Sequence, residues 1–194
     1  MKFTKNYISE AIDIIKDLDL NKIEAIVDVL LKVKKVRGRV FFLGVGGSAA
    51  NASHMVNDFR KLANIECYSP SDNISELTAR INDDGWRYCY SGWLKVSNLR
   101  SKDVLFILSV GGGDKKKKIS ENLIEAIKLA KKRGAIILGV VGPNGGYTNK
   151  MADVSLRINV KNLKNQTPHS EAIQMLISHL LVSHTKLKVN KTKW

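Results

Sequence analysis

The segment Gly44-Val45-Gly46-Gly47-Ser48-Ala49-Ala50-Asn51-Ala52-Ser53-His54 follows the apolar run Val40–Leu43 directly. The apolar run is typical of a buried strand, and the second half of the segment is typical of a helix. A strand, a glycine turn and a helix N-terminus together form an anion site, because free backbone N–H groups and the helix dipole point at one spot. Ser48 is placed to cap the helix and to offer a hydroxyl group. The segment therefore predicts a phosphate-binding turn.

The rest of the chain repeats this alternation of apolar strands and helices. Strands are predicted at 40–45, 65–68, 104–110, 135–141 and 154–158, and helices at 3–18, 21–36, 48–62, 76–81, 86–96 and 119–133. A last helix is predicted to start with Thr167 as its N-cap and Pro168 as its first residue. Buried strands that alternate with helices indicate an α/β fold with a parallel sheet covered on both faces.

A second glycine-rich loop, 109–113, follows the strand at 104–110, and a third, 142–146, follows the strand at 135–141. Ligands of parallel α/β sheets bind beyond the carboxyl ends of the strands. The first loop, with Ser48 nearby, and the second loop, with Ser109, therefore favour a binding site over simple turns. No acidic residue stands where dinucleotide binding requires one, and no Gly-Lys-Ser/Thr follows a loop. Both the dinucleotide-binding motif and the P-loop are therefore disfavoured.

The net charge of +14 comes from 32 basic and 18 acidic residues. The lysines are scattered apart from the runs 115–118 and 186–193, with no interleaved aromatic residues and no helix-turn-helix or RRM signature. We interpret them as a solvated surface that attracts anionic substrates, and expect no nucleic-acid partner. The apolar runs are too short to span a bilayer. Charged residues interrupt the N-terminal helix pattern, which is unlike the apolar core of a signal peptide. The two cysteines, Cys67 and Cys89, are too few for a disulfide framework. These features predict no membrane partner and a cytoplasmic location.

His54 and Asp58 are four residues apart on the predicted helix, so both project from one face. Such a pair beside a phosphate-binding turn suits acid–base chemistry or metal binding. By itself, however, the spacing is more common in surface hydrogen bonds.

Several motifs occur in the order found in one family. They are the segment 44–54, Asn82-Asp83, Leu108-Ser109-Val110-Gly111-Gly112-Gly113-Asp114, Gly142-Pro143-Asn144-Gly145-Gly146, and Thr167-Pro168-His169-Ser170-Glu171 followed by His179. From about residue 21 to 187 the chain resembles the sugar isomerase (SIS) domain of phosphoheptose isomerases. The resemblance implies one domain over 1–194, with N-terminal helices in 1–37 that serve oligomerisation and a basic tail at 188–194. It implies a three-layer fold around a five-stranded parallel sheet, and a homotetramer with sites between subunits.

The activity that the resemblance implies is conversion of sedoheptulose 7-phosphate to D-glycero-D-manno-heptose 7-phosphate, for activated heptose and bacterial surface polysaccharide. It further implies one Zn²⁺ per site, held by His54, Asp58, Glu171 and His179, with Asp58 and His179 as base and acid. The implied substrate-binding residues are Gly46, Gly47, Ser48, Asn51, Asp83, Ser109, Gly111, Gly112, Asp114, Thr167 and Glu171.

Three departures from the family pattern matter. Asp58 replaces the usual Glu, Glu171 replaces a Gln, and the loop after Ser109 has glycines where hydroxyl residues are common. Glu171 and His179 are eight residues apart, so they converge on one ion only if it lies between elements. Either Asp58 or Glu171 can be the base. The alternative function is a non-catalytic SIS protein, either a sugar-phosphate-sensing regulator or an adaptor in replication initiation; a less favoured one is an isomerase of another phosphosugar.

Overall fold

The computed structural model describes residues 1–192 and contains the predicted five-stranded sheet. All strands are parallel, in the order β2-β1-β3-β4-β5. The strands are β1 (Val40–Leu43), β2 (Cys67–Tyr68), β3 (Val104–Ser109), β4 (Ile136–Val141) and β5 (Val154–Arg157). The helices are α1 (Lys2–Lys16), α2 (Leu20–Lys35), α3 (Gly47–Leu62), α4 (Ile74–Asp84), α5 (Cys89–Val96), α6 (Glu121–Arg133), α7 (Gly146–Met151) and α8 (Gln166–Ser183), with 3-10 turns η1 (Pro70–Asp72) and η2 (Leu163–Asn165).

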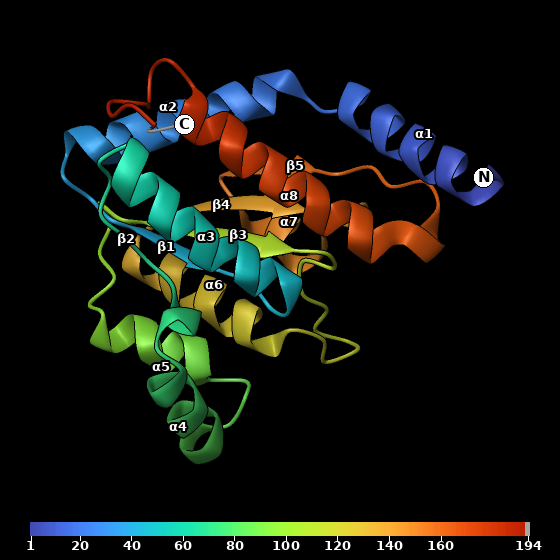
Figure 1. The fold of residues 1–194 in the computed structure, drawn as a ribbon. Coiled ribbons are helices and arrows are strands. Elements are labelled where there is room, and N and C mark those ends of the chain that lie inside the picture. The colour runs from blue at the N-terminus through green and yellow to red at the C-terminus, as the bar shows by residue number, and fades with distance from the viewer. Residues whose placement is uncertain (193–194) are drawn as a thin grey trace.

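The sheet separates two hydrophobic layers (Figure 1). Phe42 and Phe106 face α2, α3 and α8, whereas Phe41 and Leu105 face α5 and α6. This follows from the strand geometry, since successive side chains point to opposite faces. Both cysteines are buried and free, as expected of small core residues. Within residues 1–192 no helix combines the length and the apolar character needed to cross a bilayer.

Three local predictions are wrong. The helix α3 begins at Gly47 with Gly46 as its N-cap, because Gly46 adopts a φ of 62° that a glycine reaches freely; Ser48 therefore lies inside the helix and does not cap it. The helix α8 begins at Gln166, so Pro168 is its third residue, where a missing N–H costs no intrahelical bond. The segment 82–84 continues α4 up to Gly85 instead of separating two helices, and the short helix α7 was not predicted.

A polar cluster attaches α1 to the start of α8. The Glu10 carboxylate accepts hydrogen bonds from Asn162 Nδ2 at 2.8 Å and Asn165 Nδ2 at 2.7 Å, and lies 3.0 Å from His169 Nε2. The buried His169 ring lies 4.2 Å from the ring of Tyr7. His169 is thus structural.

We expect Glu10→Gln to lower the melting temperature at pH 7, because an amide replaces one accepting oxygen by a donor. Hydrogen bonds from Asn165 and Asn162 lower the pKa of the Glu10 carboxyl from its usual value. The stabilisation is therefore complete above the usual glutamate pKa and is lost as the pH falls through the lowered pKa. Melting curves between pH 7 and pH 3 test this, with Asp13→Asn on the exposed side of α1 as the control. Equal acid sensitivity of Glu10→Gln and the unmodified protein would contradict it.

Candidate active and metal site

The helices α3 and α8 lie side by side and run in the same direction (Figure 1). Gln174, which is buried, joins them: it accepts from Ser48 Oγ at 2.9 Å and from Asn51 Nδ2 at 3.3 Å. Asn51 Nδ2 also donates to the Glu171 carbonyl oxygen at 2.9 Å. Ser48 and Asn51 therefore direct their side chains toward α8, and this pairing fixes which residues of the two helices face each other further along.

One and a half turns after Ser48, this register brings His54 of α3 opposite His179 of α8. Their Nε2 atoms are 3.2 Å apart, and Asp58 Oδ2 lies 3.2 Å from His54 Nε2 and 3.6 Å from His179 Nε2. The ligand atoms of all three residues lie within 4.8 Å of one another. The spacing in the sequence pointed to the His54–Asp58 pair, the family resemblance implied His179, and the fold brings all three together.

This group of His54, Asp58 and His179, which we call the triad, fits a zinc ion. Zinc bonds of about 2.0–2.1 Å in a tetrahedron place neighbouring ligand atoms about 3.3 Å apart, close to the observed separations. Two imidazoles and one carboxylate also match the ligands of catalytic zinc sites, which keep a further position open for substrate. Asn57 Nδ2 donates to Asp58 Oδ1 at 3.0 Å, which leaves Oδ2 for the histidines.

The triad is open to solvent. The side chains of His54 and His179 are 47% and 55% exposed, whereas that of Asp58 is 14% exposed. The three residues line a hollow of about 510 Å³ together with side chains of α3, the end of α8 and the tail residue Thr192. A small ligand can therefore reach the triad in the single chain.

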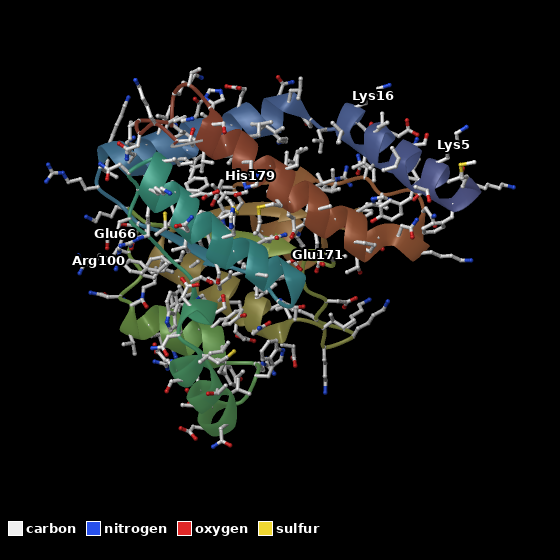
Figure 2. The ribbon with its side chains drawn as sticks, in the orientation of Figure 1. Lys5, Lys16, Glu66, Arg100, Glu171 and His179 are labelled. Atoms are coloured by element: carbon white, nitrogen blue, oxygen red, sulfur yellow. The ribbon has the colours of Figure 1, made fainter. Side chains whose placement is uncertain are left out.

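Glu171 does not lie in the triad of its own chain. It precedes His179 by eight residues on α8, about 12 Å along a helix, and Figure 2 shows the two residues well apart. Its carboxylate lies against Gly47, where any Cβ atom would collide with it. No hydrogen bond or ion pair of this carboxylate exists within residues 1–192. Its role as a metal ligand stays a prediction.

The glycine turn after β1 is held by close backbone packing. A Cβ atom at Gly44 would collide with the backbone of Ser48, so this position requires glycine. The Gly44 carbonyl accepts a 2.7 Å hydrogen bond from the hydroxyl of Tyr90. Burial raises the pKa of Tyr90, which keeps the phenol protonated as a donor. Neither Tyr90 nor Gln174 was expected at this site, because each acts on a segment far away in the sequence.

The second and third glycine loops pack against each other at the carboxyl ends of β3 and β4. Thr148 N and Oγ1 both donate to the Gly112 carbonyl oxygen at 2.8 Å, and Tyr147 N donates to that of Gly113 at 2.8 Å. Ser109 Oγ accepts from Gly112 N at 3.0 Å, so this hydroxyl stabilises the loop. Asp114 Oδ1 accepts from Lys116 N and Lys117 N, so it closes the turn that follows.

Two predicted substrate residues lie apart from the triad. Thr167 is exposed in the first turn of α8. Asp83 is in the last turn of α4, whose apolar residues pack on the other side of the sheet from α8, and it accepts from Asn82 Nδ2 at 2.8 Å. Their roles stay predictions.

Comparisons with known proteins identify the family of this chain. The sequence model of the SIS domain matches residues 5–142. The chain belongs to the SIS-domain family. Over 149 residues it is 31% identical to a phosphoheptose isomerase of Rhodospirillum rubrum, covering 74% of this chain and 73% of that protein. It is 30% identical over 191 residues to the lincomycin biosynthesis protein LmbN of Streptomyces lincolnensis, covering 93% of this chain and 68% of that one.

The fold of this SIS protein is also that of a solved relative. The structure of phosphoheptose isomerase GmhA from Neisseria gonorrhoeae superposes with a TM-score of 0.80 at 23% identity, covering 94% of this chain and 97% of that one. Within its family the chain therefore groups with the phosphoheptose isomerases, and it is an isomerase.

We expect the protein to bind one Zn²⁺ per chain and His179→Ala to weaken this binding by about a hundredfold or more, because it removes one of three ligands. Competition with a chromophoric chelator measures the affinity. The matched control is His184→Ala, since His184 lies beside Glu24 at 3.2 Å and not in the triad. Equal zinc affinities of the two variants would exclude the triad as the metal site.

Proposed function

We propose that this SIS protein interconverts sedoheptulose 7-phosphate and D-glycero-D-manno-heptose 7-phosphate. The observation that carries the proposal is the convergence of His54, Asp58 and His179 in an open hollow on the α3–α8 pair. Such a triad offers the proton-transfer groups that ketose–aldose isomerisation requires, together with ligands for a metal that would stabilise charge on the substrate oxygens.

The reaction moves a proton between C1 and C2 through a cis-enediol, so one base must serve two adjacent carbons. Asp58 Oδ2 and His179 Nε2, 3.6 Å apart, are close enough to act on adjacent atoms of one substrate. In this proposal the carboxylate takes the proton from carbon, and the imidazole donates to and accepts from the substrate oxygens; each group does so only while its triad atom is not bound to metal. A zinc ion held by the triad would stabilise negative charge on O1 and O2.

The base itself has two candidates. Asp58 is near the histidines but is also a metal ligand, and a carboxylate bound to metal is a weaker base. The Glu171 carboxylate has no hydrogen bond or ion pair among residues 1–192, but it is distant from the triad in its own chain. Glu171 can serve as the base of this triad only if the site forms between subunits and the carboxylate comes from a second copy.

Exposed apolar residues on α1 support assembly with a second copy. Ile8, Ile12 and Ile15 share one face of the helix and are 54%, 46% and 43% exposed. Leu176 and Leu180 of α8 are exposed as well, at 40% and 37%. These faces fit the homotetramer that the family resemblance implies, in which the N-terminal helices serve oligomerisation.

The wider proposal follows the same relatives. The protein would act in the cytoplasm as one SIS domain over 1–194, with 1–37 as N-terminal helices and a basic tail at 188–194, of which residues 193 and 194 lie outside the described residues. Its product would supply nucleotide-activated heptose for surface polysaccharide. The ligand roles of Gly46, Gly47, Asn51, Asp83 and Thr167 belong to the same proposal.

The test is turnover of sedoheptulose 7-phosphate by zinc-loaded protein in deuterium oxide. We expect an aldose with deuterium at C2, and a kcat about 10²–10⁴-fold lower for His179→Ala, because a triad residue that serves as acid–base group or zinc ligand is lost. His184→Ala serves as the folded control. Full turnover by His179→Ala would exclude the triad as the catalytic site. Binding of the phosphosugar without turnover by the unmodified protein would instead support the sensing function.

A second test concerns assembly. We expect light scattering after size exclusion to show a tetramer, and Ile12→Lys to give smaller species with lower activity, because a charge then replaces an apolar contact. Val96→Lys, at an exposed valine on α5, is the control. A tetramer that persists in Ile12→Lys would remove α1 from the interface.

A further inference from the structure

A cationic hollow lies at the amino ends of β1 and β2, at the edge of the sheet opposite to the glycine loops. Its volume is about 380 Å³, and it shares no lining residue with the hollow of the triad. Figure 2 shows Glu66, which lines it, well apart from Glu171, which lies against the start of α3. The charged lining residues are Lys34, Arg37, Arg60 and Glu66, so three cations face one carboxylate.

The carbonyl ends of α2 and α3, which both contribute lining residues, are occupied by donors. Free carbonyl groups at a helix end carry partial negative charge and repel anions. Here the Val33 carbonyl oxygen accepts from Gly38 N at 2.9 Å. The Leu62 carbonyl oxygen accepts from Val189 N at 2.9 Å and from Asn190 N at 3.1 Å. These carbonyl groups therefore have partners of their own, and the lining cations are left to attract a ligand.

Arg37 is the lining cation that the fold itself does not use. Its φ is 50°, in the left-handed region that favours glycine or asparagine. Its side chain is exposed and makes no hydrogen bond or ion pair within residues 1–192. A glycine would end α2 at this position with less conformational strain. No contact within the chain therefore accounts for an arginine here.

Arg60 faces the hollow from the last turn of α3 and is oriented by β2. Its Nη1 atom donates to the Cys67 carbonyl oxygen at 3.2 Å, and its guanidinium carbon lies 5.5 Å from the centre of the Tyr68 ring. The other nitrogen atoms of the guanidinium group donate to no residue within 1–192. The carboxylate of Glu66 is engaged as well, since Oε1 accepts from the Tyr68 hydroxyl at 2.9 Å.

Polar groups of the turn between α3 and β2 add to the lining. The backbone N–H groups of Asn64 and Glu66, and the side-chain amide of Asn64, donate to no residue within 1–192. Ile65 between them is buried, and its N–H donates to the Phe59 carbonyl oxygen at 3.2 Å, which fixes the turn. Across the hollow, Lys34 Nζ is 3.4 Å from the Leu187 carbonyl oxygen. Donors from three separate segments thus surround one space.

We propose that this hollow binds a small molecule that carries a diphosphate group. A guanidinium group pairs with phosphate oxygens through two parallel hydrogen bonds, so Arg37 and Arg60, from separate elements, suit two linked phosphates. The volume exceeds that of a single phosphate and lies in the range of small-molecule sites. Inorganic diphosphate and a nucleoside diphosphate share this chemistry. The site is apart from the triad, so it does not depend on the proposed isomerase function.

The test is calorimetric titration of the full chain with inorganic diphosphate. Two double variants of equal charge change are compared: Arg37→Gln/Arg60→Gln, and Arg133→Gln/Arg157→Gln, which removes two exposed arginines that do not line the hollow. We expect the first to raise Kd about tenfold or more, since charge-assisted hydrogen bonds are lost. The control should stay within about twofold, which is small beside the loss of such bonds.

A single variant protects the test from misfolding, because Arg60 also contacts β2. Arg37→Gln removes a side chain without partners within 1–192, and diphosphate should raise its melting temperature less than that of the unmodified protein. In the same titration, tighter binding of ADP than of diphosphate would assign the site to a nucleotide, and equal or weaker binding would assign it to the diphosphate group alone.

Three results would overturn the site. They are no binding of diphosphate by the unmodified protein, equal affinities of the lining variant and the control, and binding of orthophosphate as tight as that of diphosphate. An anion site elsewhere on the chain would give the second result, because its affinity would not depend on Arg37 and Arg60.

Discussion

The buried hydrogen bonds of Gln174 are the constraint on which the site depends. This one amide accepts from Ser48 and Asn51 of α3, and its own Nε2 lies 3.5 Å from the Val140 carbonyl of β4. A buried amide without partners is costly, so α3 and α8 are held in the register that satisfies it. That register places His54 opposite His179, although 125 residues separate them in the sequence. The chemistry of the triad is thus a consequence of polar packing about one and a half turns away.

The architecture was largely predictable from the sequence. The apolar strands, the glycine loops at their ends and the helical periodicity together indicate the parallel sheet. In a parallel sheet the loops that follow the strands lie at one edge, where ligands bind. Errors fall where tertiary contacts override local preference. Ser48 has the right chemistry for a cap, but the positive φ of Gly46 starts the helix earlier and turns the hydroxyl toward Gln174.

The site was predictable only in part. The spacing of His54 and Asp58 indicates a shared face, and the family resemblance added His179 and Glu171. Sequence reasoning grouped all four residues around one ion, whereas the fold gathers three of them and leaves Glu171 at the start of α3. Nothing in the local sequence marks Gln174 or Tyr90, since their partners are distant carbonyl, hydroxyl and amide groups. The lysine run 115–118, interpreted as solvated surface, is exposed, and Lys115, Lys116 and Lys117 also border an open hollow beside the glycine loops.

The contact between the second and third glycine loops has an evolutionary consequence. A side chain at Gly112 would meet the Gly145 backbone, and one at Gly146 would meet the backbone of Gly111 and Gly113. Because backbone opposes backbone, no second substitution can make room for the first. These glycines cannot drift independently, so related chains that keep this loop pairing should keep Gly112 and Gly146 together or lose both. The pair is therefore a marker by which chains with this form of the loop can be told apart from their relatives by sequence alone.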